Sequence, residues 1–199
     1  HRDLHSFPTR RSSDLGAVGL WQFKINTARM LDLNVTSYVD DRMDVYKSTD
    51  AACRYLQYLF RIFRDWHLAL AAYNGGPGAV RNAILRSGGE TNFWKLVPYL
   101  PEPTRNYIPA FIAATFVAKN FSDFDIEPVD PLFTYAGIDT LQVYGGFYLE
   151  GVKKVTHVDM ELLRFLNPSF RAGFVPDNGK FYTLVLPHAA VKNFFLSYN

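Results

Sequence analysis

The sequence predicts a mainly α-helical protein, in which a helical domain is followed by a small α/β module of order strand, helix, helix, strand. Between residues 16 and 120, apolar side chains recur at the three- and four-residue spacing of amphipathic helices. Between residues 139 and 187, two alternating segments flank two helical ones. A chain of 199 residues with 48% hydrophobic and 20% charged residues is long and apolar enough to build both parts.

The helical domain is expected to start with a short helix at residues 27–31. Ser48, Thr49 and Asp50 are all preferred N-cap residues, so we expect the next helix to begin there. Its apolar stripe consists of Ala52, Tyr55, Leu56, Leu59, Phe60 and Phe63.

A central buried helix is predicted at residues 66–73, capped by Asp65, because this segment is apolar nearly all round. The glycines and proline of residues 74–78 must end it, and a further helix is expected at residues 79–86. The last helix of the domain should begin close to Arg105, since Pro109 is tolerated only in a first turn.

Residues 1–15 (HRDLHSFPTRRSSDL) follow neither helical nor strand periodicity. A nucleotide string that encodes this peptide resembles a common short-read sequencing adapter. We therefore interpret the segment as non-native and expect the native sequence to begin near Gly16.

The C-terminal third begins with a predicted linker at residues 121–138, which contains prolines and aspartates. A strand at 140–143, a helix at 149–156, a second helix capped by Asp159 and a second strand at 182–186 are expected next. Residues 188–199 form a tail with no assignment.

Composition excludes several classes of function. A net charge of +2 is too small to indicate a nucleic-acid partner, and no apolar run is long enough to span a membrane. The single cysteine, Cys53, excludes an internal disulfide and is expected to be buried. Five histidines without ligand spacing predict neither a metal nor a cofactor. We expect a monomer whose tryptophans Trp21 and Trp66 lie in the core.

Three ordered motifs resemble the soluble lytic transglycosylase (SLT) domain, most closely the membrane-bound murein transglycosylase D type. They are Gly19–Phe23 (GLWQF), Ala71–Asn74 (AAYN) and Leu100–Tyr107 (LPEPTRNY). The resemblance implies a lysozyme-like helical fold. It also implies cleavage of the bond between N-acetylmuramic acid and N-acetylglucosamine in peptidoglycan, with a 1,6-anhydro product.

In that family one glutamate, upstream of the first motif, acts as general acid and then as base. This chain has no glutamate before Glu90, so the resemblance implies that the catalytic glutamate is lost upstream of Gly16. Asp3 and Asp14 are poor substitutes, since aspartate is shorter and small misplacements are costly in catalysis. The chain as written is expected to be inactive.

The resemblance assigns substrate binding to Gln22, Tyr73, Asn74 and Tyr107. Each also has an ordinary structural interpretation. Gln22 could be a solvated residue at a helix start, Asn74 a helix cap, and Tyr107 a core residue.

Residues 139–187 resemble a degenerate LysM module, a binder of N-acetylglucosamine polymers. Its sugar-binding loops would be residues 144–147 and 167–173, which are not diagnostic, so a module that serves only packing remains an alternative.

The predicted partner is the glycan strand of peptidoglycan, and the predicted location is the periplasm or cell envelope of a bacterium. Two alternatives stay open, namely a non-catalytic peptidoglycan-binding pseudo-enzyme and a goose-type lysozyme relative that hydrolyses with water.

Overall fold

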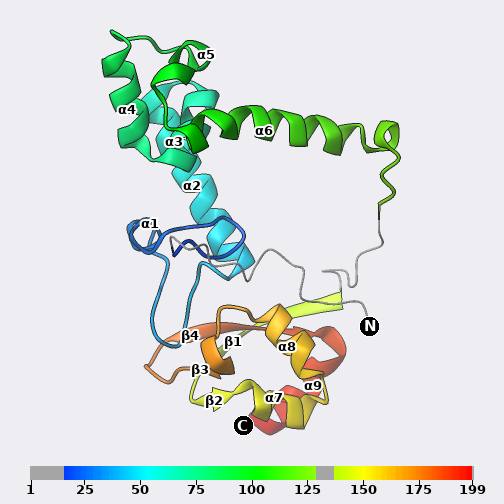
Figure 1. Ribbon diagram of the computed structural model, residues 1–199. Coiled ribbons are helices and arrows are strands. Elements are labelled where there is room, and N and C mark those ends of the chain that lie inside the picture. The colour runs from blue at the N-terminus through cyan, green and yellow to red at the C-terminus, as the bar shows by residue number, and fades with distance from the viewer. Residues whose placement is uncertain (1–15, 129–136, 199) are drawn as a thin grey trace. The chain divides into compact units, whose positions relative to one another are not determined.

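The computed structural model describes residues 16–128 and 137–198, and it confirms a mainly helical chain with a small C-terminal α/β module (Figure 1). The α-helices are α1 (Ile25–Met30), α2 (Val45–Phe63), α3 (Trp66–Gly75), α4 (Pro77–Arg86), α5 (Phe93–Leu96), α6 (Glu102–Lys119), α7 (Leu149–Thr156), α8 (Met160–Leu166) and α9 (His188–Tyr198). The strands are β1 (Ile138–Tyr144), β2 (Phe147–Tyr148), β3 (Phe174–Val175) and β4 (Phe181–Pro187). Short 3₁₀ helices are η3 (Val97–Tyr99), η4 (Phe121–Phe124) and η6 (Arg171–Gly173).

The described residues divide into two compact units. The first combines residues 16–51 with residues 137–198, and the second holds residues 52–128. The first unit therefore contains the GLWQF segment together with the C-terminal module, whereas the second contains α3 to α6.

Helix α2 begins earlier than the sequence suggested. Asp44 Oδ1 accepts hydrogen bonds from the backbone N–H groups of Tyr46 and Lys47, both at 3.0 Å, so Asp44 caps the helix. The predicted cap cluster lies inside the helix, where Ser48 is buried. The expectation of a start at Ser48 was wrong because a better-placed carboxylate precedes it.

Helix α6 also begins earlier, at Glu102, with Pro103 in its first turn and Pro109 in its interior. An interior proline removes one backbone hydrogen bond. Pro109 is exposed, so water can satisfy the carbonyl that loses its partner. The predicted start near Arg105 was therefore too late.

The C-terminal module has the expected order of strand, helix, helix and strand. β1 and β4 pair antiparallel, from Ile138 opposite Pro187 to Tyr144 opposite Phe181, and α7 and α8 lie between them in sequence. Asp159 caps α8 as predicted, accepting from the N–H of Glu161 at 2.9 Å. The structure adds the short antiparallel pair of β2 and β3.

Asn167 joins the end of α8 to β4. Its side-chain oxygen accepts from the N–H of Val185 at 2.8 Å, and its amide nitrogen donates to the carbonyls of Leu163 (2.9 Å) and Val185 (2.8 Å). Because these bonds occupy both ends of its amide, Asn167 has a structural role in this loop.

The core of the C-terminal module includes one residue from far upstream, Val39. Val39 forms an isolated β-bridge with Phe170, and the N–H of Arg171 donates to the carbonyl of Tyr38 at 2.7 Å. The buried core residues are Val39, Val143, Leu149, Val152, Leu163, Phe170, Val175, Leu184, Leu186 and Phe194. Residues near 38–40 are thus part of the same packed unit as the module.

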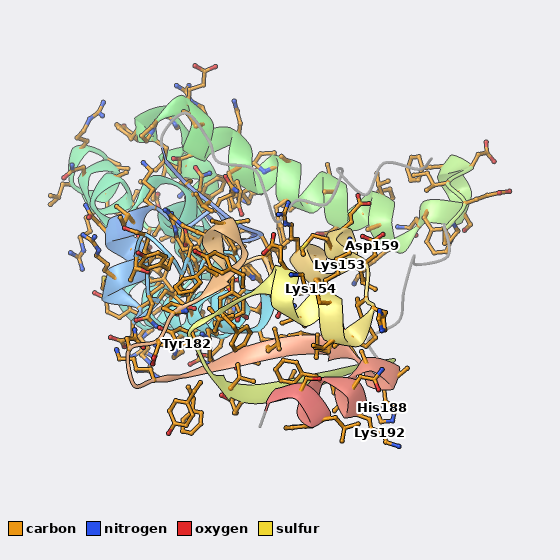
Figure 2. The ribbon with its side chains drawn as sticks, turned by 90° about the horizontal axis from the view of Figure 1, so that it is seen from below. Lys153, Lys154, Asp159, Tyr182, His188 and Lys192 are labelled. Carbon is orange, nitrogen blue, oxygen red and sulfur yellow. The ribbon has the colours of Figure 1, made fainter. Side chains whose placement is uncertain are left out.

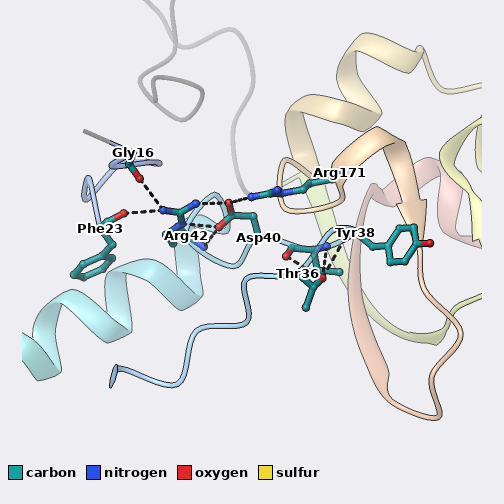
Figure 3. Close-up of polar contacts among 8 residues, drawn as sticks. Gly16, Phe23, Thr36, Tyr38, Asp40, Arg42 and Arg171 are labelled. Carbon is teal, nitrogen blue, oxygen red and sulfur yellow. Dashed lines mark hydrogen bonds and ion pairs between the residues drawn. The ribbon is translucent and has the colours of Figure 1, made fainter. Parts of the chain in front are cut away.

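A buried ion network holds this segment in place (Figure 3). Arg42 binds Asp40 through two nitrogens, Nε to Oδ1 and Nη2 to Oδ2, each at 2.8 Å. Arg171 Nη2 donates to the same Oδ2 at 2.6 Å, while Arg42 Nη1 donates to the carbonyls of Gly16 (3.0 Å) and Phe23 (3.1 Å). The side chains of Asp40 and Arg42 are only 3% and 5% exposed, so this charge pair lies inside the fold.

Electrostatics within the network favour the ionised carboxylate. Burial of Asp40 opposes ionisation, but the hydrogen bonds and charges of Arg42 and Arg171 outweigh it and hold the pKa of that carboxyl below its ordinary value.

The C-terminal tail without a predicted structure forms helix α9, on which His188 and Lys192 lie (Figure 2). Its Ala190 and Phe194 are buried. Part of the predicted linker is ordered as η4, and β1 begins at Ile138, whereas residues 129–136 lie outside the described residues.

Residues 1–15, for which a non-native origin was predicted, also lie outside the described residues. Within the described ranges, no helix is both long and apolar enough to cross a membrane, and no cluster of His, Cys, Asp and Glu could hold a metal ion.

Cys53 is exposed on α2, so the expectation of a buried thiol was wrong.

Candidate substrate-binding site

The candidate site lies where helices α3 and α6 approach each other closely. Asp65 caps α3 as predicted, accepting from the N–H of Leu68 at 2.9 Å. At the other end, a Cβ atom on Gly75 would overlap the buried side chain of Thr104 at the start of α6. Glycine is therefore required for the two helices to approach this closely.

Two of the predicted substrate-binding residues come together at this crossing. Tyr73 lies on α3 and Tyr107 on α6, and both are half-buried. Burial, followed by the Coulombic influence of Tyr107 and Tyr55, raises the pKa of the Tyr73 hydroxyl well above its ordinary value. At neutral pH this hydroxyl is protonated and can donate a hydrogen bond.

Helix α2 contributes two further tyrosines. The ring of Tyr55 lies 5.7 Å from that of Tyr73, and the ring of Tyr58 stacks on Tyr55 at 6.3 Å. Tyr58 is 49% exposed. We call Tyr55, Tyr58, Tyr73 and Tyr107 the tyrosine cluster. Tyr55 is buried, as predicted for the apolar stripe of its helix, whereas Tyr58 was not predicted as a site residue. The signal was their spacing of three residues on one helix face.

Asn74 is exposed in the last turn of α3, next to Tyr73. Gly76 follows with a φ of 85°, which ends α3 and begins α4, and Pro77 occupies the first turn of α4. Asn74 is thus available to solvent beside the tyrosine cluster.

Gln22 belongs to the first compact unit, whereas the tyrosine cluster and Asn74 belong to the second. It occupies a turn between the bridged residues Val18 and Phe23, with a φ of 52°, and its side-chain Nε2 donates to the carbonyl of Gly19 at 2.7 Å. The expectation of a helix-start position was wrong, since α1 begins only at Ile25. This amide supports its own turn.

The turn that carries Gln22 is itself fixed by the ion network. A Cβ atom on Gly19, whose φ is 83°, would overlap the carbonyl oxygen of Arg42. The half-buried Trp21 donates from Nε1 to Thr49 Oγ1 at 2.8 Å.

In the second unit Trp66 is 53% exposed and stacks on Phe60, so its assignment to the core was wrong.

The first glutamate of the chain cannot take over a general acid's role. Glu90 Oε1 accepts from the N–H groups of Asn92 (2.8 Å) and Thr91 (2.9 Å), and Oε2 pairs with Lys95 at 3.2 Å. The backbone hydrogen bond from Asn92, followed by Lys95, lowers the pKa of Glu90. A general acid needs the opposite shift.

Comparison with known families gives two matches. Residues 6–96 match the family described as the transglycosylase SLT domain. Residues 137–199 match the family described as the LysM-like domain of lytic transglycosylase MltD. The first match starts inside the segment 1–15, whose non-native origin stays a prediction. The second includes helix α9.

Several known proteins are similar to this chain. Membrane-bound lytic murein transglycosylase D from Escherichia coli K12 is 37% identical over 126 residues, which cover 61% of this chain and 27% of that protein. A putative tributyltin chloride resistance protein from Alteromonas is 38% identical over 77 residues, covering 38% of this chain and 37% of that protein.

Among solved structures, the 70 kDa soluble lytic transglycosylase from Escherichia coli aligns with a TM-score of 0.42 and 29% identity. The alignment covers 50% of this chain and 17% of that one.

Proposed function

This chain belongs to the lytic transglycosylase family, with an SLT domain followed by an MltD-type LysM-like domain, and from this premise we propose that it binds peptidoglycan glycan strands. The binding site is the tyrosine cluster together with Asn74. The observation that carries the proposal is the convergence of tyrosines from three helices, one of which, Tyr73, directly precedes Asn74 in the segment that resembles the family motif.

Each side chain suits a glycan. Aromatic rings pack on the apolar faces of pyranose rings, and Tyr58 is exposed enough to do so. The protonated hydroxyl of Tyr73 can donate to a sugar oxygen, and the Asn74 amide can both donate to and accept from an acetamido group. We also assign recognition of an acetamido group to Gln22 of the first unit, whose amide nitrogen donates to the carbonyl of Gly19.

The chemistry of the family requires a proton donor at the glycosidic oxygen, which then takes a proton from the C6 hydroxyl of muramic acid as that hydroxyl attacks C1. No glutamate precedes Glu90 in this chain, and Glu90 has its pKa shifted in the wrong direction. We therefore propose that these 199 residues bind and orient the glycan strand without cleaving it.

The chain spans 27% of the length of the Escherichia coli relatives that it matches. Because these relatives are membrane-bound lytic murein transglycosylases, we propose a location in the bacterial cell envelope for this chain. We further propose that it acts as a monomer and that its LysM-like domain contributes to retention on the same polymer.

Binding is tested with glycan strands freed of peptides by an amidase. Wild-type chain is compared with Tyr58→Ala and with the matched control Tyr46→Ala, since both tyrosines are exposed on α2 but only Tyr58 belongs to the cluster. Loss of one stacking ring should weaken binding about three- to tenfold, as expected for roughly 0.5–1.5 kcal/mol.

Tyr46→Ala should bind as wild type. Equal affinities of the two variants, or no binding of glycan by the wild-type chain, would refute the proposed site.

A further inference from the structure

A cavity lies in the helical unit, between α4, η3 and the start of α6. Its volume is about 470 Å³. The polar side chains on its wall are Asn82 and Arg86 from α4, Tyr99 from η3, and Arg105 from α6, and Leu100 and Pro101 add apolar surface.

The wall of this cavity carries two positive charges and no acidic residue. The Nε of Arg105 is buried and has no hydrogen-bond partner among the described residues. Arg86 lies over the ring of Tyr99 at 5.9 Å and forms no ion pair within the described part of the chain. The wall therefore offers two guanidinium charges and no carboxylate to compensate them, so an anion in the cavity would be stabilised by their charge.

The cavity is separate from the tyrosine cluster. Arg105 and Tyr107 are two residues apart on α6, and at 3.6 residues per turn their side chains leave the helix in directions about 200° apart. A ligand of the cavity is therefore not the sugar stacked on the tyrosines.

We propose that this cavity binds a free carboxylate of a peptidoglycan stem peptide, an inference that rests on the proposed function. The planar guanidinium groups of Arg86 and Arg105 match the geometry of a carboxylate, to which each can donate hydrogen bonds. Tyr99, Leu100 and Pro101 contact the apolar part of the adjoining amino acid. Of the two arginines, Arg105 is half-buried and Arg86 is exposed.

The experiment measures binding of a synthetic stem tetrapeptide to the full chain by isothermal titration calorimetry. The same peptide with every carboxylate amidated, and inorganic phosphate alone, serve as comparison ligands. The variant is Arg86→Gln, and the matched control is Arg81→Gln, because Arg81 is exposed on the same helix but does not line the cavity.

We expect the free peptide to bind. Amidation or Arg86→Gln should weaken it about tenfold or more, the loss of one charge-assisted interaction. Arg81→Gln should bind as wild type. Equal binding of the amidated peptide, no effect of Arg86→Gln, or phosphate binding as tightly as the peptide would overturn the proposal.

Peptide-free glycan strands separate this inference from the proposed function. If those strands bind and the tetrapeptide does not, only the carboxylate site fails. If the strands also fail to bind, the proposed function fails with it.

Discussion

The two units contain two pairs of arginines in opposite electrostatic surroundings. Arg42 and Arg171 converge on the buried carboxylate of Asp40, with nitrogen–oxygen distances of 2.6–2.8 Å. Arg86 and Arg105 share a cavity whose wall contains no acidic side chain. The first pair shares one buried carboxylate, whereas the second has no acidic side chain among the residues that line its cavity.

This difference separates a structural role from a binding role. A buried charge must be paired to be tolerated, so removing Asp40 should damage the fold. Arg86 is exposed, so water can solvate its charge, and removing it should affect a ligand more than stability.

Asp40→Asn should cause the largest loss of stability. It removes the negative charge but leaves Arg42 buried without its counter-ion, which should lower the free energy of unfolding by about 3 kcal/mol or more. Denaturant unfolding measures the change. Asp32→Asn is the control in the same unit, because Asp32 is exposed and should tolerate the substitution. Similar stabilities for the two variants would show that the network contributes little.

Acid should reproduce this loss in the wild-type chain. The folded-state pKa of Asp40 lies below its unfolded value, so its contribution is fully present above about pH 4 and declines as pH falls through the folded pKa. The difference in melting temperature between wild type and Asp40→Asn should therefore shrink below that pH. A difference that stayed constant down to strongly acid pH would contradict the assignment.

Gly75→Ala should destabilise the helical unit by about 1–3 kcal/mol, because the added methyl group overlaps Thr104 in a close-packed crossing. Gly78→Ala on α4 is the matched control. Its Cβ would meet no atom within 4 Å, and alanine favours helix. Urea unfolding of both variants checks the prediction, and an unaffected Gly75→Ala would rule out a tight crossing.

Arg171→Gln should cost about 1 kcal/mol, less than the loss of Asp40. Its side chain is 45% exposed, so water screens the pair and can solvate the site after the change. The free energy of unfolding should fall between those of wild type and Asp40→Asn. A cost as large as that of Asp40→Asn would mean that Arg171, instead of Arg42, carries the network.

Arg86→Gln should be the mildest change to stability, within about 0.5 kcal/mol of wild type, since this exposed residue forms no ion pair with the described residues. Thermal unfolding without ligand tests it. A large destabilisation would place Arg86 with the structural arginines and remove the contrast between the two pairs.

Local signals were well predicted from sequence. Asp65 and Asp159 cap their helices as expected, because a cap is set by residues that are neighbours in the chain. The same rule gave the wrong start for α2, because Asp44 and residues 48–50 are all favourable N-cap residues. Only the packing of the folded chain decides which of them begins the helix. For α6, the exposure of Pro109 made an interior proline tolerable.

Long-range features could not be predicted. Asp40 and Arg171 are 131 positions apart, and no pattern near either residue indicates the other. Likewise Val39 enters the core of a module that begins near residue 138. Tyr73 and Tyr107 were identified through motif resemblance, while Tyr58 required the helix packing that stacks it on Tyr55.

We have proposed that this chain binds glycan strands without cleaving them. The most direct test incubates purified peptidoglycan with the chain and analyses the released sugars by mass spectrometry, alongside a boiled control. We predict that the chain is retained on the polymer and releases neither 1,6-anhydro nor reducing muramic acid products above that control. Release of either product would contradict the account.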